Sequence, residues 1–238
     1  MDVSWKAGDL LNGDTITLNL TGAFDDANVG ENKIVRITGT APNDDRYAIT
    51  IPSTTTASIT ATQATVSGVQ SGPWEYTGSE ISLLQNGAAT NGTIVYSRNG
   101  VDFMETSPTE TNAGKYTVYY KAQGNTNYAD SDVRMVEVTI QPKTVNVTGS
   151  TAIELSQDSF EYDGTAKEPD VIRVLDGSNV IPASEYTVSY RNNTAVGTAT
   201  VTITDVAGGN YTVSGSTTFT ITAGAPALTS ANLKVIFT

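Results

Sequence analysis

The chain has 238 residues, a formal net charge of −12, and neither cysteine nor histidine. These counts exclude a disulfide framework, a Cys/His metal site and His-based acid–base catalysis. The acidic balance argues against nucleic acid or an anionic membrane surface as a partner. No apolar run approaches the roughly 20 residues of a transmembrane helix. Residues 1–5 lack the basic start and apolar core of a signal peptide, so we expect an intracellular protein or a piece of a longer exported one.

A module of roughly 80 residues occurs three times, which is long enough for one sandwich core. An aromatic-Glu-Tyr-x-Gly sequence begins at Trp74 and again at Phe160, 86 residues later. Three further markers keep a similar period of 81 to 84 residues: Gly30, Gly114 and Gly197; Tyr47, Tyr128 and Tyr211; Ile59, Ile140 and Ile221. The period predicts a first repeat at 1–62, a second at 63–142, a third at 143–223, and a linker with a stray strand at 224–238.

The predicted first repeat is N-terminally incomplete or shortened. Gly30 has only 29 residues before it, and the aromatic-Glu-Tyr-x-Gly marker is missing. Alternation of apolar and polar residues predicts strands at 15–20 and 34–37. Turn-forming residues at 42–45 precede a further predicted strand at 47–51.

In the predicted second repeat, Trp74 occupies the position of Phe160, so both are expected in the core. Residues 94–97 run into Asn99-Gly100, which predicts a hairpin turn. The next strand places Tyr116, Val118 and Tyr120 on its core face and Tyr119 on the surface, and Val136, Val138 and Ile140 end the repeat.

The predicted third repeat follows the same pattern. Phe160 and Tyr162 repeat the aromatic pair, and a repeat this small needs most of its aromatic residues inside. Asp176-Gly177 and Asn192-Asn193 predict turns. Ala199, Val201 and Ile203 are expected in the core. Strands are predicted at Val145 to Val147, 171–175, 186–190, 198–204 and 217–222, with a stray one at 233–237.

Short β-branched strands, separated by turns every 8–12 residues or so, are typical of antiparallel sandwiches. Linkers of only two or three residues around 60–62 and 141–143 favour a serial arrangement. The sequence therefore predicts an all-β fold of tandem antiparallel β-sandwich domains in an extended array.

The third repeat resembles the YDG/MBG-type repeats of large bacterial surface proteins. The residues that carry this resemblance are Tyr-Asp-Gly-Thr at 162–165, the stretch at 186–193, Gly197, Asn210-Tyr211 and Phe-Thr-Ile at 219–221. The first repeat looks like the other variant of this group, and the second is similar but has Thr77 in place of the signature Asp. The resemblance implies immunoglobulin-like repeats in adhesins or other exported cell-surface proteins, which serve as spacers or adhesive arrays.

Acidic motifs were weighed as sites of chemistry. Asp163-Gly164-Thr165 resembles half of an aspartic protease motif, but Asp-Gly is a favoured turn pair, and we interpret it as a turn. Three acidic pairs could offer oxygen ligands to calcium, namely Asp25 with Asp26, Asp44 with Asp45, and Asp130 with Asp132. None has the spacing of a dedicated calcium loop, and solvated loop charge is the favoured interpretation.

Aromatic residues and one lysine complete the candidates. Trp5, Tyr96 and Tyr119 could stack on sugar rings, although scattered surface aromatics are ordinary. Asn-x-Thr sequences, which begin at Asn19, Asn91, Asn146, Asn192 and Asn210, reflect a Thr-rich composition. Lys167 could form an intramolecular amide bond with an asparagine, which intact mass would reveal.

Without a clustered catalytic set, we expect no enzyme, no catalytic, cofactor-binding or metal-binding residue, and no cofactor. The function we expect is a structural or adhesive segment of a bacterial cell-surface protein, extracellular and part of a longer exported chain. The expected partner is a host or cell-surface glycan or protein, with no nucleic acid and no membrane insertion. The alternative is a carbohydrate-binding repeat that uses exposed aromatics, and its ligand residues are unknown.

Overall fold

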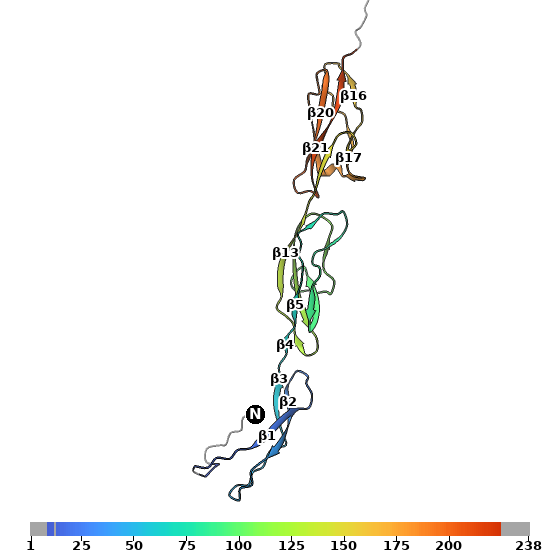
Figure 1. Ribbon diagram of the computed structural model, residues 1–238. Helices are drawn as coiled ribbons and strands as arrows, with labels where there is room; N and C mark the ends of the chain where they lie inside the picture. Colours follow the sequence, from blue (N-terminus) through green and yellow to red (C-terminus); the bar gives the residue numbers. More distant parts are fainter. Residues whose placement is uncertain (1–8, 12, 225–238) are drawn as a thin grey trace, which may run out of the picture. The chain divides into compact units, whose positions relative to one another are not determined.

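The computed structural model describes residues 9–11 and 13–224, and its regular structure is all β apart from one short 3₁₀ turn, η1 (Ala183–Glu185), as Figure 1 shows. No α-helix occurs within these residues. The predicted all-β class is therefore confirmed. Trp5 and the strand predicted at 233–237 lie outside the described residues.

The contacts within the chain divide it into two compact units. The first comprises Met1–Gln70, Gln85–Ser107 and Val118–Met135, and the second comprises Ser71–Leu84, Pro108–Thr117 and Val136–Thr238. Both units contain residues from the predicted second repeat, so the repeats of the sequence and the compact units divide the chain differently.

The first unit opens with a three-stranded antiparallel sheet in the order β1 (Asn19–Phe24), β2 (Gly30–Thr40) and β3 (Thr54–Ile59). Strand β2 contains the predicted strand at 34–37. Leu20 is opposite Gly39 and Phe24 is opposite Val35 in the register, so both belong to the sheet face of Val35, which is buried.

Two strand predictions in this sheet are wrong. The first strand begins at Asn19 and not at residue 15, because Asn19 already pairs with Thr40, the last residue of β2. Residues further upstream would have to pair beyond Thr40, where Pro42 cannot donate a ladder hydrogen bond. Residues 47–51 form no strand. Tyr47 is held by its side chain instead, because its hydroxyl donates to Asp14 Oδ2 at 2.7 Å.

The rest of the first unit is built from short strands. They are β4 (Thr62–Gln63), β5 (Thr65–Ser67), β8 (Ala88–Thr90), β9 (Gly92–Ser97), β12 (Tyr128–Ala129) and the part of β11 (Gly114–Gly124) that begins at Val118. Strand β9 pairs antiparallel with β11, β5 pairs antiparallel with β8, and β4 pairs parallel with β12. Ala64, Val66, Ile94 and Ala122 form the buried cluster.

The turn that follows β9 is wider than the hairpin predicted at Asn99-Gly100. Tyr96 and Met104 form the antiparallel bridge that closes it. Asn99 supports the intervening residues, because its Oδ1 accepts hydrogen bonds from the backbone N–H groups of Val101 and Asp102, both at 2.9 Å. Gly100 takes the positive φ of 76° that the sequence suggested.

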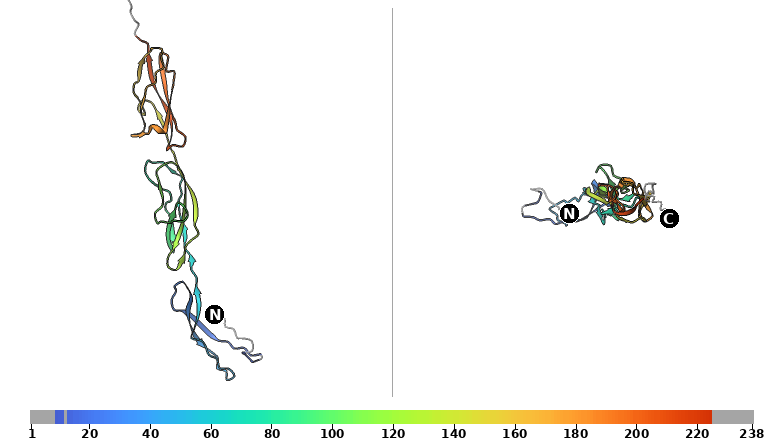
Figure 2. Two further views of the ribbon diagram at one scale, coloured as in Figure 1. Left: turned by 180° about the vertical axis from the view of Figure 1, so that it is seen from behind. Right: turned by 90° about the horizontal axis from the view of Figure 1, so that it is seen from above.

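The second unit contains one five-stranded and one three-stranded sheet. The larger has the order β14 (Lys143–Thr148), β21 (Tyr211–Thr222), β20 (Gly197–Asp205) and β19 (Tyr186–Arg191), with β16 (Ser159–Glu161) also on β21. The smaller has the order β15 (Ile153–Leu155), β17 (Val171–Asp176) and β18 (Asn179–Ile181). In Figure 2 the orange and red strands of the larger sheet are seen from behind.

Both sheets contribute to one buried cluster. Val147 and Ile203 come from the larger sheet, and Ile153, Val174 and Ile181 come from the smaller. Ala199, Val201 and Ile203 are each at most 1% exposed, as predicted for the inward face of β20. Residues 143–222 therefore form two layers of strands around a shared core.

The second unit also holds β6 (Trp74–Glu75), β7 (Ile81–Ser82), β10 (Thr109–Glu110) and most of β13 (Arg134–Gln141). Strands β7 and β10 pair antiparallel. Strands β6 and β13 pair parallel, with Trp74 opposite Ile140. Phe160 and Ile221 form the same kind of pair between β16 and β21, so the recurring aromatic and isoleucine markers are strand neighbours in both places.

One predicted aromatic pair is only half inside. Phe160 packs edge-on against Phe219, with 5.5 Å between the ring centroids. Tyr162, expected inside with it, is 49% exposed. The reason is that Tyr162 N donates to the carbonyl oxygen of Thr222, the last residue of β21, so the tyrosine lies where the sheet ends.

Candidate functional site

The Asp163-Gly164-Thr165 motif forms a turn, as the sequence indicated. Asp163 Oδ1 accepts hydrogen bonds from Thr165 N at 2.9 Å and Thr165 Oγ1 at 2.6 Å, and Gly164 has a φ of 83°. Lys167 Nζ donates to Asp163 Oδ2 at 2.6 Å. The hydrogen bond from Lys167, followed by those from Thr165, holds the pKa of Asp163 well below its ordinary value.

Lys167 does not face an asparagine amide. Its ammonium contacts Asp163 and Thr165, whereas Asn193 Nδ2 donates to the backbone oxygen of Lys167 at 3.1 Å. The amide bond suggested for Lys167 therefore stays a hypothesis for intact mass to decide.

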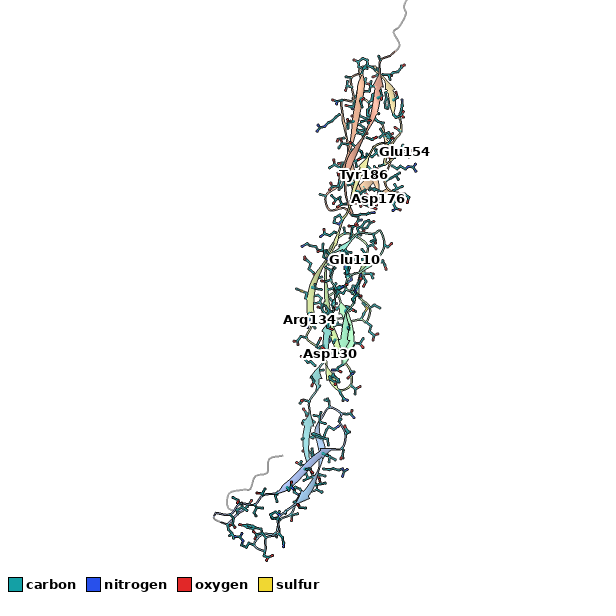
Figure 3. All side chains as sticks on the ribbon, in the orientation of Figure 1. Glu110, Asp130, Arg134, Glu154, Asp176 and Tyr186 are labelled. Atoms are coloured by element: carbon teal, nitrogen blue, oxygen red, sulfur yellow. The ribbon has the colours of Figure 1, made fainter. Side chains whose placement is uncertain are left out.

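Four of the six acidic residues considered for calcium face basic side chains instead. The pairs are Asp25 with Arg36, Asp26 with Lys33, Asp44 with Arg46, and Asp130 with Lys121. Asp130 is labelled in Figure 3. Within the described part of the chain, no three acidic side chains gather where they could share a metal ion. Each of these four paired carboxylates has a lysine or arginine to neutralise it.

Tyr96 and Tyr119, considered for sugar stacking, are both half-buried. Tyr96 packs against the cluster of Ile94 and Ala122, and this burial raises the pKa of its hydroxyl. Tyr119 lies on the face of β11 opposite Val118, as expected, and is partly exposed, while its ring covers Gly100. A Cβ atom at Gly100 would be only 3.3 Å from that ring, so the glycine leaves the space that the ring fills.

A polar hollow of about 430 Å³ lies in the first unit. Its lining consists of Gly92, Thr93, Glu105, Gln123, Gly124 and Asn125. These residues provide hydrogen-bonding groups but no aromatic face on which a sugar ring could stack. The hollow contains none of the aromatic residues that the sequence suggested.

Asn210 makes polar contacts that join distant parts of the sequence. Its Oδ1 accepts a hydrogen bond from Ala113 N at 2.7 Å, and its Nδ2 donates to Asn112 Oδ1 at 3.2 Å. Asn210 belongs to the predicted third repeat and its two partners to the second, while all of them lie in the second compact unit. We call this arrangement the Asn210 latch.

Neighbouring residues hold the Asn210 loop in place. Glu185, which is buried, accepts hydrogen bonds from Asn210 N at 2.6 Å and from Tyr211 N at 3.2 Å. A Cβ atom at position 209 would approach Glu185 Oε2 to 2.3 Å, so Gly209 is needed for this close contact. Tyr211 adds an edge-on ring contact to Tyr76, with 5.3 Å between the centroids. The side-chain amide of Asn210 is therefore held in position, and the tyrosine rings beside it add an apolar contact.

A second latch in the first compact unit has the same chemistry. Asn127 Oδ1 accepts a hydrogen bond from Val29 N at 3.1 Å, and Asn127 Nδ2 donates to Asn28 Oδ1 at 3.1 Å. Here the loop of Asn28 and Val29 belongs to the predicted first repeat, and Asn127 belongs to the second. Asn28 N in turn donates to Asp26 Oδ1 at 2.8 Å, which orders the corner that Asn127 binds. We call this the Asn127 latch.

The two latches occupy equivalent positions of the repeat. Asn28 and Asn112 are 84 residues apart, two positions before the marker glycines, and Asn127 and Asn210 are 83 apart, one position before the marker tyrosines. The glycines and tyrosines mark the repeat in the sequence, but these asparagines were not predicted as contact residues. The shared spacing was the signal that could have revealed them.

Each half of the latch is missing once. At the position of Asn28 and Asn112 the predicted third repeat has Ala195, and at the position of Asn127 and Asn210 the first has Arg46. Arg46 is engaged elsewhere, because its guanidinium pairs with Asp14 at 2.7 Å and with Asp44 at 3.0 Å. The arrangement offers hydrogen bonding between amides and backbone, which suits binding and not bond-breaking chemistry.

Comparison with known proteins finds a family match to part of the chain. Residues 2–57, less than half of the chain, match the family model of the YDG domain, which supports a YDG-type domain there. This match confirms the expected resemblance at that level. It falls on the predicted first repeat, whereas the Tyr-Asp-Gly sequence at 162–164 lies outside it. No curated protein and no solved structure matches the chain. Within the described residues, no helix has the length and apolarity needed to cross a membrane.

Proposed function

We propose that this chain is a non-catalytic structural and adhesive segment of a bacterial cell-surface protein. Its tandem immunoglobulin-like sandwiches act as a spacer that presents other modules of a longer exported chain outside the cell. The YDG-type match, the all-strand architecture and the repeat period support this proposal.

The observation that carries the proposal is the recurrence of the latch. A spacer needs its repeats to be coupled, so that a module attached at one place does not move freely relative to the next. Asn127 and Asn210 provide that coupling with the same two hydrogen bonds at equivalent positions. Each hydrogen bond contributes only about 0.5–1.5 kcal/mol, so the latches restrain joints that covalent linkers already define.

Single-molecule energy transfer tests the coupling in the full chain. Because the chain has no cysteine, Thr117→Cys and Ser189→Cys place two dyes on exposed residues of the predicted second and third repeats. We expect a narrow distance distribution that broadens in Asn210→Ala. The matched control, Asn146→Ala, removes an exposed asparagine of the third repeat and should leave the distribution narrow. A distribution that Asn210→Ala leaves unchanged would remove the main support for the proposal.

Binding assays separate the spacer from the carbohydrate-binding alternative. The labelled full chain is applied to arrays of glycans and to immobilised extracellular matrix proteins. A spacer gives no reproducible binding to the glycans. Saturable glycan binding that Tyr119→Ala abolishes, while thermal unfolding stays unchanged, would favour the alternative over the spacer.

A further inference from the structure

The first and last strands of residues 143–222 are direct neighbours. Strand β14 pairs parallel with β21 over six residue pairs, from Lys143 opposite Tyr211 to Thr148 opposite Ser216. Lys143 N also donates to Asn210 O, and Gly149 N donates to Ser216 O, both at 2.9 Å, so hydrogen bonds extend past both ends of the pairing.

The remaining length of β21 is held on the same edge by a second strand. Strand β16 pairs parallel with β21 over three further residue pairs, from Ser159 opposite Thr220 to Glu161 opposite Thr222. The other edge of β21 pairs antiparallel with β20 over eight residue pairs. Strand β21 is therefore paired on both edges along most of its length.

This topology decides how tension along the chain acts on the sheet. Tension enters at Lys143, the first residue of β14, and leaves at Thr222, the last residue of β21. Because the two strands run parallel and side by side, the two ends are pulled in opposite directions along the strand axes. All the hydrogen bonds between β14 and β21 are then loaded together, and none can be broken before the others.

Side-chain packing adds resistance to the same sliding motion. Val145 and Val147 on β14 and Val213 on β21 are each at most 9% exposed and belong to one core cluster. Sliding β14 along β21 would move these side chains out of a packed core, which costs free energy in addition to the hydrogen bonds.

A close backbone contact shows how tightly the two strands fit. Val147 and Gly215 are opposite each other in the register, and a Cβ atom at Gly215 would lie only 1.6 Å from Val147 O. Gly215 also has a φ of 155°, which L-residues rarely adopt. Any side chain at this position must push β14 away from β21.

We propose that residues 143–222 are a force-bearing module, in which β14 and β21 form a mechanical clamp that resists tension along the chain. The inference deepens the proposed spacer function, because a spacer on a cell surface carries the load applied to whatever it presents. Forced unfolding is governed by the barrier to unfolding, and in this geometry that barrier includes the simultaneous loss of six paired positions.

Pulling the same protein in two directions tests the clamp. In the full chain, Gln141→Cys with Ala223→Cys places handles beyond the two ends of the parallel pair, so the clamp is sheared. Gln141→Cys with Ala207→Cys places both handles near the end where Lys143 faces Tyr211, so β14 is peeled from β21 one pair at a time. Gln141, Ala207 and Ala223 are exposed, and the chain has no other cysteine.

We expect the rupture force to be severalfold higher in the shearing geometry than in the peeling geometry at the same pulling speed. Equal forces in the two geometries would overturn the clamp. Both double variants must keep the wild-type thermal midpoint, which shows that only the direction of loading differs.

A third variant perturbs the clamp itself. Gly215→Val should lower the shearing force towards the peeling force, and an unchanged shearing force in a folded Gly215→Val protein would also overturn the proposal. If this variant fails to fold, the comparison of geometries still decides, since it uses the native strands. Failure of the clamp leaves the spacer intact, because the energy-transfer and binding experiments above do not depend on rupture force.

Discussion

Replacing Asn210 with alanine is the sharpest test of the latches. The substitution removes the hydrogen bond that Ala113 N donates to Asn210 Oδ1 and the one that Asn210 Nδ2 donates to Asn112 Oδ1. The first of these is half-buried, so the N–H of Ala113 is left with a desolvation cost, whereas the second is exposed and can be replaced by water. The long hydrogen bond from Asn210 Nδ2 to Glu185 Oε1, at 3.5 Å, is lost as well. The backbone hydrogen bonds to Glu185 survive, because they come from the main chain.

The expected loss of stability follows from this difference in burial between the two hydrogen bonds. An unsatisfied half-buried donor costs about 1–3 kcal/mol, and a solvent-exposed hydrogen bond adds a few tenths at most. The equivalent Asn127→Ala removes two hydrogen bonds that are both exposed, so we expect a loss of under about 1 kcal/mol there. Asn210→Ala and Asn127→Ala therefore remove hydrogen bonds of the same kind, and the expected loss of stability is larger for Asn210→Ala.

Amide hydrogen exchange measures this loss at the affected group. Exchange reports on one amide, whereas a thermal midpoint reports on a whole cooperative unit and would dilute the effect. We expect the exchange rate of the Ala113 amide to rise roughly 5- to 150-fold in Asn210→Ala, with a smaller rise at Val29 in Asn127→Ala. An unchanged rate at Ala113 would refute the reasoning, since it would mean that Asn210 does not protect this amide.

The remaining predictions concern the core and one surface turn. Phe219→Ala should destabilise residues 143–222 by about 3–5 kcal/mol, because it empties a buried site. Phe219 is 2% exposed, and the substitution also removes its edge contact with Phe160. Thermal unfolding measures this loss, and the exposed control Tyr162→Ala should stay within about 0.5 kcal/mol of wild type. The hydrogen bond from Lys167 lowers the pKa of Asp163. The carboxylate therefore stabilises the fold fully above its ordinary pKa of 3.8, and this contribution is lost as the pH falls through the depressed folded-state pKa. Asp163→Asn should therefore lower stability at neutral pH and flatten the acid limb of a plot of thermal midpoint against pH. Parallel curves for the two proteins would contradict that prediction.

Strands in which apolar and polar residues alternate, with the apolar face buried, were predictable from the sequence. Ala199, Val201 and Ile203 alternate with threonines, and this period of two fixes which side of β20 faces the core. Val145 and Val147 on β14 follow the same rule. The polarity of such residues indicates by itself which side of the strand is buried, so the prediction needs no knowledge of the pairing strand.

Predictions failed where a strand depended on its neighbour. Residues 15–18 alternate well but have no partner strand beyond Thr40, because Pro42 follows it. Tyr162 has the right spacing to be buried, yet it lies at the end of β21, where the sheet no longer covers it. Alternation alone cannot show where the opposing strand stops.

The latches were not predicted, for a different reason. Asn210 and Asn112 are polar residues in loops, 98 positions apart, and nothing in their local sequence distinguishes them from ordinary turn asparagines. Only the equal spacing of Asn28 with Asn112 and of Asn127 with Asn210 indicates a shared role. The contact becomes evident when the structure brings the two loops together.

The distribution of the latch halves has a consequence for how repeats can be exchanged. The predicted second repeat holds both halves, since Asn112 is bound by the repeat that follows and Asn127 binds the one that precedes. If the second repeat were duplicated, each new junction would contain both the binding asparagine and the loop that it binds. Duplication of the third repeat would pair Asn210 with Ala195 and leave the new junction without its amide acceptor. The repeats thus share a sequence period but are not interchangeable in order.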